Sequence, residues 1–266
     1  MQNIPTLTLN NGVKMPTLGL GVYQVPKGSA TEQTVRAALK MGYRLIDTAA
    51  YYRNEKEVGE AIHSSGIARE EIFVTTKLHP ITFGNFEQAF VKSLEELGLT
   101  YVDLYLIHWP LLRRKAAWSA LENIYRSGKV RAVGVSNFTT NDLDDILARG
   151  SIVPAVNQVE LHPFRYNAEF LEYCKVKGIV LEAHSPLTHG KRINSPILET
   201  VGRKYQKSPA QILLRWVIQH GLIAIPKTTN EHHMRENMDI FDFALDRESM
   251  RQLDNLNEHY HAAGLS

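Results

Sequence analysis

Short apolar runs that alternate with longer amphipathic stretches constrain this 266-residue chain more than any other feature. The runs are rich in Val, Ile and Leu and cover residues 18–22, 44–47, 72–77, 102–109, 130–136, 155–160, 179–184 and 222–226. Short uninterrupted apolar runs are typical of parallel strands that are buried on both faces. We therefore expect eight strands in one parallel sheet.

The stretches between the runs space their apolar residues by three or four positions, which predicts helices. The expected helices cover residues 32–41, 55–65, 86–97, 118–127, 141–149 and 169–177. Another helix is expected to begin at Ser208 and Pro209, a capping serine followed by proline, and to run through Trp216. Eight strands that alternate with helices favour the α/β class and a (β/α)₈ TIM barrel. An open doubly wound sheet is the alternative.

The first residues do not follow this rhythm. Residues 6–9 and 13–15 read as two short strands around Asn10-Asn11-Gly12, a turn that carries the Asn-Gly pair of tight hairpins. We expect an N-terminal β-hairpin that closes the barrel bottom. Because no linker or low-complexity tract divides the chain, we expect a single domain over residues 1–266.

Composition narrows the classes of partner. Lys and Arg number 30 against 28 Asp and Glu, whereas a surface that follows nucleic acid is far more basic. The N-terminus shows no basic segment followed by an apolar run, and no stretch approaches the roughly 18 apolar residues of a membrane helix. Cys174 is the one cysteine, which indicates a reducing compartment. We expect a monomeric cytoplasmic protein with a small-molecule substrate and with neither nucleic acid nor a membrane as partner.

Ionisable residues stand at the ends of successive runs. Asp47, Lys77 and His108 end or follow the second, third and fourth runs. Each alone is explained as a solvated or helix-capping residue. Because the carboxyl ends of barrel strands meet on one face, where catalytic residues of such barrels lie, the three together indicate an active site.

Six motifs around these residues are specific and stand in order. They cover residues 42–55, 73–78, 102–110, 134–138, 157–163 and 225–227. The chain resembles the aldo-keto reductase family from about Leu9 to Leu256, and its pattern is closest to bacterial 2,5-diketo-D-gluconate reductases. The resemblance implies NAD(P)H-dependent reduction of aldehydes and ketones to alcohols. Candidate substrates are small or polar carbonyl compounds: diketo sugar acids, methylglyoxal and aromatic aldehydes.

The resemblance also implies a catalytic tetrad of Asp47, Tyr52, Lys77 and His108. A phenol with its ordinary pKa near ~10 is a weak acid at neutral pH, and an adjacent ammonium lowers that pKa. We therefore expect Tyr52 to be the general acid, Lys77 to tune it, Asp47 to hold Lys77 and His108 to orient the carbonyl. The family spacing selects Tyr52, and Tyr51 is expected to serve packing.

The cofactor is expected across the barrel mouth. Gly19-Leu20-Gly21 lacks the third glycine of a dinucleotide fingerprint and is interpreted as strand-end packing. The resemblance implies that Ser136, Asn137 and Gln158 hold the nicotinamide carboxamide. The full implied set is Gly21, Val22, Asp47, Ser136, Asn137, Gln158, His184, Ser185, Leu187, Lys227, Thr228, His233, Glu236 and Asn237.

Two positions depart from the family pattern. His184 stands where Tyr or Trp usually lies under the nicotinamide, and we expect it to be neutral so that it does not repel the oxidised ring. His233 stands where an arginine usually forks onto the 2′-phosphate. We therefore expect NADPH to be preferred through Lys227, by a smaller margin than usual, with NADH usable.

The substrate-binding residues implied by the resemblance are Tyr23, His79, His108 and Trp109. The segment 111–117 is short, and the chain stops at Ser266 with much of the usual closing tail absent, so we expect weak discrimination between substrates. Arg113-Arg114-Lys115 is interpreted as a solvated loop, with steering of anions as the alternative.

Other functions remain as alternatives. The pair His232-His233 could bind a metal, but we find no carboxylate or cysteine at ligand spacing and expect no metal site. A metal-dependent barrel hydrolase would need more inward ligands than His108 and Asp47. A non-catalytic nicotinamide-nucleotide-binding regulatory barrel is the main alternative.

Overall fold

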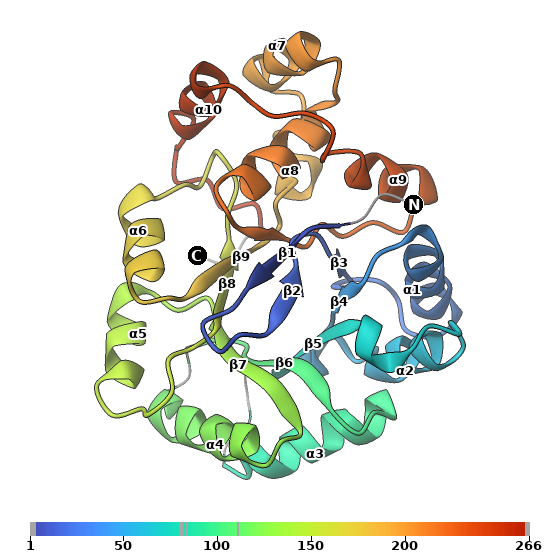
Figure 1. The fold of residues 1–266 in the computed structure, drawn as a ribbon, viewed down its shortest axis with the longest axis vertical. Coiled ribbons are helices and arrows are strands. Elements are labelled where there is room, and N and C mark those ends of the chain that lie inside the picture. Colours follow the sequence, from blue (N-terminus) through green and yellow to red (C-terminus); the bar gives the residue numbers. More distant parts are fainter. Residues whose placement is uncertain (1–3, 80–81, 83, 111, 264–266) are drawn as a thin grey trace.

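Eight parallel strands form a ring in the computed structural model, which describes residues 4–79, 82, 84–110 and 112–263 (Figure 1). In sheet order they are β10 (Ile223–Ala224), β9 (Val180–His184), β8 (Val156–Glu160), β7 (Val130–Ser136), β6 (Val102–Ile107), β5 (Phe73–Leu78), β4 (Leu45–Asp47) and β3 (Leu20–Gly21). All eight expected strands are therefore present.

The two ends of this sheet meet, so the barrel is closed. Leu18 and Ala224 form a parallel bridge. The Gly19 amide donates to the Ala224 carbonyl at 2.9 Å, and the Ala224 amide donates to the Thr17 carbonyl at 2.9 Å. The (β/α)₈ prediction is confirmed, and the open doubly wound alternative is wrong.

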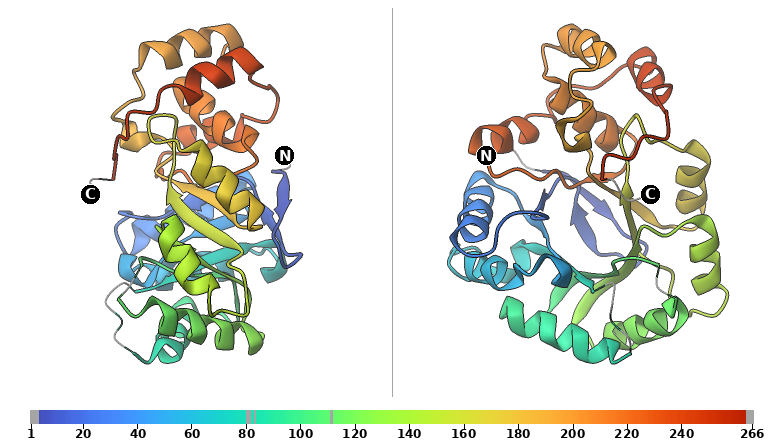
Figure 2. Two further views of the ribbon diagram at one scale, coloured as in Figure 1. Left: turned by 90° about the vertical axis from the view of Figure 1, so that its left-hand side faces the viewer. Right: turned by 180° about the vertical axis from the view of Figure 1, so that it is seen from behind.

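Helices surround the ring (Figures 1 and 2). They are α1 (Ser29–Met41), α2 (Glu55–His63), α3 (Phe86–Leu97), α4 (Arg114–Arg126), α5 (Thr140–Leu147), α6 (Ala168–Val176), α7 (Pro196–Tyr205), α8 (Pro209–Gln219), α9 (Glu231–Met238) and α10 (Arg247–Asp254). Within the described part of the chain, no helix is both long and apolar enough to cross a membrane. The seven helices expected from periodicity are present. The helices α7, α9 and α10 were not among the ranges predicted from the sequence.

The N-terminal hairpin closes one end of the barrel. Its strands β1 (Thr6–Thr8) and β2 (Lys14–Pro16) are antiparallel and enclose Gly12, whose φ of +85° suits a residue without a side chain. Asn11 donates to the Arg131 carbonyl at 2.9 Å, and Asn10 donates to the Pro154 carbonyl at 3.1 Å. These carbonyls lie at the amino-terminal ends of β7 and β8, so the hairpin lies at the bottom, as expected. In the side view the hairpin and the C-terminal segment lie on opposite faces (Figure 2).

The barrel interior changes character from bottom to top. Near the hairpin it is apolar and includes Leu45, Phe73, Leu104 and Ile223, packed against Met15. Toward the carboxyl ends of the strands it is polar, with fully or almost fully buried Asp47, Lys77, Gln158 and Glu182. Burying polar groups is costly unless they have hydrogen-bond partners. A buried polar layer at this end of the barrel therefore marks the candidate site.

Candidate active site

The predicted tetrad comes together at the carboxyl ends of β4, β5 and β6. Lys77 is completely buried, and its ammonium donates to Asp47 Oδ1 at 2.6 Å, to the Thr48 carbonyl at 2.9 Å and to the Tyr52 hydroxyl at 3.3 Å. An ammonium has three N–H donors, and all three are used. Asp47 is also buried, so the two charges form an ion pair shielded from water.

Electrostatics keep Lys77 charged. Burial lowers its pKa, but the charge of Asp47 and the hydrogen bond to Asp47 raise it, and the pKa of Lys77 lies above its ordinary value. The second oxygen of Asp47 accepts a hydrogen bond from Gln158 Nε2 at 2.7 Å. The carboxylate therefore has polar partners on both oxygens.

The acidity of Tyr52 differs from the expectation. Burial raises the pKa of Tyr52 to about 12, because desolvation of the phenolate and the charge of Asp47 together outweigh the lowering effect of Lys77. The direction of the Lys77 effect is as expected, but the expected net lowering is wrong. Tyr52 therefore keeps its proton at neutral pH.

Two residues missed by the sequence argument anchor the segment that follows Tyr52. Tyr52 ends a short 3₁₀ turn, η1 (Ala50–Tyr52). Beyond it, Asn54 is fully buried, accepts from the Thr48 hydroxyl at 2.8 Å and donates to the Val22 carbonyl at 3.1 Å. Glu55 accepts from the Thr76 hydroxyl at 2.6 Å. The sequence did contain a signal for them, because both residues follow Tyr52 within the same family motif. The sequence argument used that motif only to choose Tyr52 over Tyr51.

His108 faces Tyr52 as a neutral imidazole. Their rings meet edge to face with centroids 5.5 Å apart. Burial, reinforced by the charge of Lys77, lowers the pKa of His108 to about 2. The neutral ring carries one N–H donor, which suits a hydrogen bond to a carbonyl oxygen.

Aromatic rings of the expected substrate residues gather around this site. The Tyr23 ring lies 5.0 Å from that of Tyr52. Tyr51 is 50% exposed and lies 5.4 Å from the ring of His79 and 6.1 Å from that of His108. Tyr51 therefore packs against these two histidine rings, as expected, although its side chain is half exposed instead of buried.

The residues expected around the nicotinamide also lie together. Asn137 follows β7 and donates to Ser136 Oγ at 3.0 Å, and Ser136 donates to the Gln158 carbonyl at 2.9 Å. Asn137 and Ser185 adopt left-handed φ values of +62° and +52° at the ends of β7 and β9. Such backbone is costly for residues other than glycine and is concentrated at functional sites.

His184 ends β9 and is neutral, in agreement with the expectation. Burial lowers the pKa of its imidazole to about 3. Its Nε2 lies 3.0 Å from Asn137 Oδ1 and its Nδ1 lies 3.2 Å from Ser185 Oγ. A ring with Nε2 as donor and Nδ1 as acceptor satisfies both contacts.

The hydrogen bonds of Gln158 restrict how its side chain can bind a ligand. Its single amide nitrogen donates to Asp47 Oδ2 and to Glu182 Oε2, each at 2.7 Å. Both N–H donors are thereby directed into the barrel. A carboxamide ligand would therefore be held through the amide oxygen of Gln158.

The adenosine end of the expected cofactor site surrounds α9. Lys227, Thr228 and His233 are exposed or partly exposed, and Asn237 is 1% exposed. Asn237 Nδ2 is buried without a hydrogen-bond partner among the described residues. An unpaired buried donor of this kind fits a ligand that offers an acceptor. Gly21 closes this side of the barrel, since its amide donates to the Pro226 carbonyl at 3.1 Å. Val22 is buried and Leu187 is partly buried.

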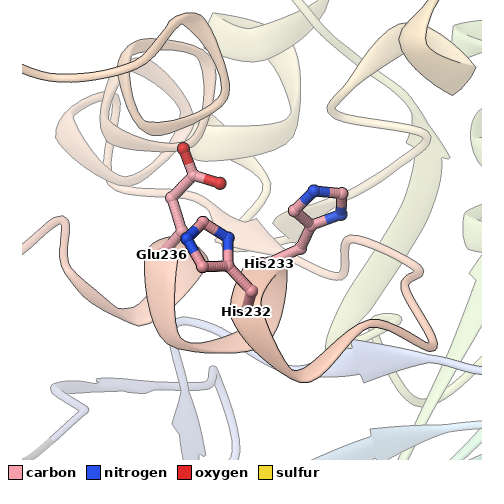
Figure 3. Close-up of side chains that lie close together, drawn as sticks. All are labelled: His232, His233 and Glu236. Carbon is pink, nitrogen blue, oxygen red and sulfur yellow. The ribbon is translucent and has the colours of Figure 1, made fainter.

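The histidine pair on α9 has a carboxylate neighbour. His232, His233 and Glu236 place their ligand atoms within 4.8 Å of one another on the outer face of the helix (Figure 3). The expectation that no carboxylate stands at ligand spacing is wrong, because one helical turn brings Glu236 beside the pair. That the protein works without a metal remains a prediction.

Two residues of the basic segment 113–115, Arg114 and Lys115, lie in a helix, and Arg113 lies in the turn before it. Helix α4 begins at Arg114, four residues before the expected start. Arg114 pairs with Asp142 at 3.5 Å and also with Asp145, and Lys115 pairs with Asp145 at 3.3 Å. Both charges therefore bind the acidic first helical turns of α5 instead of forming a free patch, which weakens the steering alternative.

A cavity of about 700 Å³ opens beside the tetrad. It reaches the barrel mouth at Trp109, Asn137 and His184, and its outer wall includes Tyr166 and Phe170. Tyr23, His79, His108 and the other tetrad residues do not line it. The tetrad therefore lies outside this cavity, and the two are linked by Asn137, which lines the cavity and donates to the His108 carbonyl at 3.2 Å.

The C-terminal segment supplies part of the cavity wall. Asn257, His259, His261 and Ala263 line it. The Ala262 amide donates to Glu160 Oε1 at 2.5 Å. Burial raises the pKa of Glu160, but hydrogen bonds from His162 and the Ala262 amide have a larger opposite effect. The net result is a pKa of about 2. Residues 257–263 thus form part of the cavity wall, and the weak discrimination expected from the short tail stays a prediction.

Comparison with known proteins agrees with this geometry. The family model described as "Aldo/keto reductase family" matches residues 17–258. The glyoxal reductase of Bacillus subtilis (strain 168) is 50% identical over 257 residues, which are 95% of this chain and 93% of that protein. A crystal structure of an aldo/keto reductase from Brucella melitensis has a TM-score of 0.92 and 43% identity, and covers 96% of this chain and 100% of that one. A Bombyx mori aldo-keto reductase, solved in complex with NADP, has a TM-score of 0.93 and 33% identity, and covers 99% and 96%.

The closed barrel and the polar layer at its mouth define an oxidoreductase of carbonyl groups that uses a nicotinamide cofactor. The chain belongs to the aldo/keto reductase family.

The buried ion pair makes a testable contribution to stability. Asp47→Asn leaves the Lys77 ammonium buried without its counter-charge, and we expect the free energy of unfolding to fall by about 3 kcal/mol. Urea unfolding at neutral pH measures this. The matched control is Asp145→Asn, the same change in an exposed pair, which should alter stability little. Equal losses in the two variants would contradict the special status of the buried pair.

Proposed function

We propose that Asp47, Tyr52, Lys77 and His108 carry out the carbonyl reduction, with Tyr52 as the general acid. The observation that supports this most directly is the Lys77 ammonium, which has all three donors engaged and directs one of them to the Tyr52 hydroxyl at 3.3 Å. The residues at the barrel mouth and around α9 would hold a nicotinamide dinucleotide, which supplies the hydride when bound.

The chain's own residues then manage the proton. A carbonyl oxygen placed between His108 and Tyr52 would accept a hydrogen bond from each. As hydride adds to the carbonyl carbon, negative charge develops on the oxygen and the Tyr52 hydroxyl transfers its proton there. The phenolate left on Tyr52 is stabilised by Lys77 and regains a proton from solvent. Because an alkoxide is a much stronger base than a phenolate, a Tyr52 pKa of about 12 still permits this transfer.

The cofactor assignment follows the same residues. Asn137, Ser136 and the amide oxygen of Gln158 would hold the carboxamide, with the neutral ring of His184 against the nicotinamide. Lys227 would bind a 2′-phosphate, with His233 as a weaker second partner than an arginine. We therefore propose NADPH as the preferred cofactor, with NADH usable.

The substrates proposed are small or polar carbonyl compounds. The B. subtilis relative is named a glyoxal reductase, which supports small dicarbonyls such as methylglyoxal. A cavity of about 700 Å³ leaves room for larger molecules, including diketo sugar acids and aromatic aldehydes. We also propose that the chain acts as a monomeric, single-domain cytoplasmic enzyme.

The role of Tyr52 can be tested by removing one hydroxyl. Tyr52→Phe keeps the ring, and we expect kcat for aldehyde reduction to fall by roughly 10²- to 10⁴-fold, since general-acid catalysis is lost. The dissociation constant of the cofactor should stay close to that of the parent. Tyr51→Phe, the same change one residue earlier, should lose less than about tenfold. A Tyr52→Phe enzyme as fast as the parent would exclude this mechanism, and a parent that binds cofactor without turnover would favour the regulatory alternative.

The cofactor preference can be tested at α9. We expect the ratio of kcat/KM for NADPH over NADH to be below about a thousandfold in the parent and to rise about tenfold in His233→Arg, because a guanidinium forks onto phosphate. His232→Arg adds the same charge one position away and serves as the control. If both variants raise the ratio equally, added charge alone explains the effect and His233 does not face the phosphate.

A further inference from the structure

Glu182 is a buried carboxyl group to which neither the sequence argument nor the mechanism gives a role. It lies in the middle of β9 and is fully buried. In the sheet it pairs with Gln158 of β8 and with Ile223 of β10. Its side chain therefore belongs to the polar layer beneath the barrel mouth.

A continuous chain of hydrogen bonds links Glu182 to the catalytic phenol. Glu182 Oε2 accepts from Gln158 Nε2 at 2.7 Å, and the same nitrogen donates to Asp47 Oδ2 at 2.7 Å. Asp47 Oδ1 in turn accepts from Lys77 at 2.6 Å, and Lys77 reaches the Tyr52 hydroxyl at 3.3 Å. A change of charge on Glu182 would therefore act on Tyr52 through hydrogen-bonded groups inside the barrel, where charges are screened poorly.

The charges in this layer do not balance if both carboxyl groups are ionised. The groups that face Glu182 are Asp47 from β4 and Lys77 from β5, with the neutral His184 two positions later on its own strand. One ammonium can compensate one carboxylate, and Asp47 already holds it at 2.6 Å. The other oxygen of Glu182, Oε1, is buried with no hydrogen-bond partner among the described residues. A charged oxygen in that position would be especially costly.

We propose that Glu182 is a positioning residue that is held as a neutral acid at physiological pH, and that its ionisation at alkaline pH weakens Tyr52 as a proton donor. A second negative charge in this layer favours the ammonium of Lys77 and disfavours the phenolate that Tyr52 must become. Burial, followed by the charge of Asp47, raises the pKa of Glu182 to about 8, in keeping with the geometry. The consequence for turnover rests on the role proposed above for Tyr52, whereas the neutral state of Glu182 does not.

The neutral state is tested without any catalysis. Glu182→Gln keeps the shape and the acceptor for Gln158 but cannot ionise. In the unfolded chain a glutamate ionises from about pH 4.3 upward, but in the folded protein Glu182 ionises near pH 8. The parent should therefore lose Tm relative to Glu182→Gln as pH rises through this window and then reach a plateau. A difference in Tm that stays flat with pH would overturn the proposal.

The effect on Tyr52 is tested by the pH profile of reduction. Between about pH 7 and pH 9.5, we expect kcat of the parent to fall roughly threefold to tenfold more than kcat of Glu182→Gln. Glu182→Asp retains an ionisable group and should retain the decline. Glu122→Gln is the matched control, since Glu122 is a buried carboxylate of α4 that accepts from the Ser151 and Ile152 amides, away from the tetrad.

The outcomes separate the two claims. Parallel pH profiles for the parent and Glu182→Gln would overturn the proposed link to Tyr52, even if the Tm window is found. If Tyr52→Phe is fully active while the Tm window of Glu182 is present, the proposed role of Tyr52 fails but the neutral state of Glu182 is supported.

Discussion

The rest of the active site depends on one buried ion pair, that of Lys77 and Asp47. Neither charge is stable alone inside the barrel, and the 2.6 Å contact between them is what permits an ammonium beneath the mouth. Two N–H groups of this ammonium donate to Asp47 and to the Thr48 carbonyl, and the third donates to the Tyr52 hydroxyl. Without the pair, the Lys77 ammonium would be buried with no counter-charge at hydrogen-bond distance.

The fold makes this pair possible by separating two tasks along the barrel axis. The hairpin and the apolar layer close and stabilise the bottom, where Leu45 and Phe73 pack under Met15. The top is left for polar side chains carried on rigid strand ends. Because β4 and β5 are neighbours in register, Asp47 and Lys77 face the same interior layer without any strain in the strands. Strain is instead placed at the following residues, such as Asn137 and Ser185, where the chain leaves the strands.

Much of this architecture could be predicted from the sequence because it depends on local patterns. Apolar runs marked all eight strands, and Asn-Gly marked the hairpin. Asp47, Lys77 and His108 could be placed on one face because they end successive runs. Some of the failures depend on partners far away in the sequence. Gln158 turns its amide toward Asp47, which is 111 positions distant, and no local pattern encodes that choice.

Burial was the other source of error. The pKa of Tyr52 was expected to fall because a neighbouring ammonium lowers it, but desolvation is larger and of opposite sign. At the barrel mouth the missing information was again a distant partner. Arg114 was assigned to a loop because its partners on α5 are not apparent from the local sequence. The cavity wall formed by residues 257–263 depends on Glu160, about a hundred positions earlier in the chain.

The most direct test of the central claim removes both charges at once. In the double variant Asp47→Asn with Lys77→Met no uncompensated charge remains buried, so folding should be retained. If the Lys77 ammonium stabilises the phenolate of Tyr52, kcat for carbonyl reduction by this variant falls by about a hundredfold or more while cofactor binding persists. Turnover within about twofold of the parent would contradict the account.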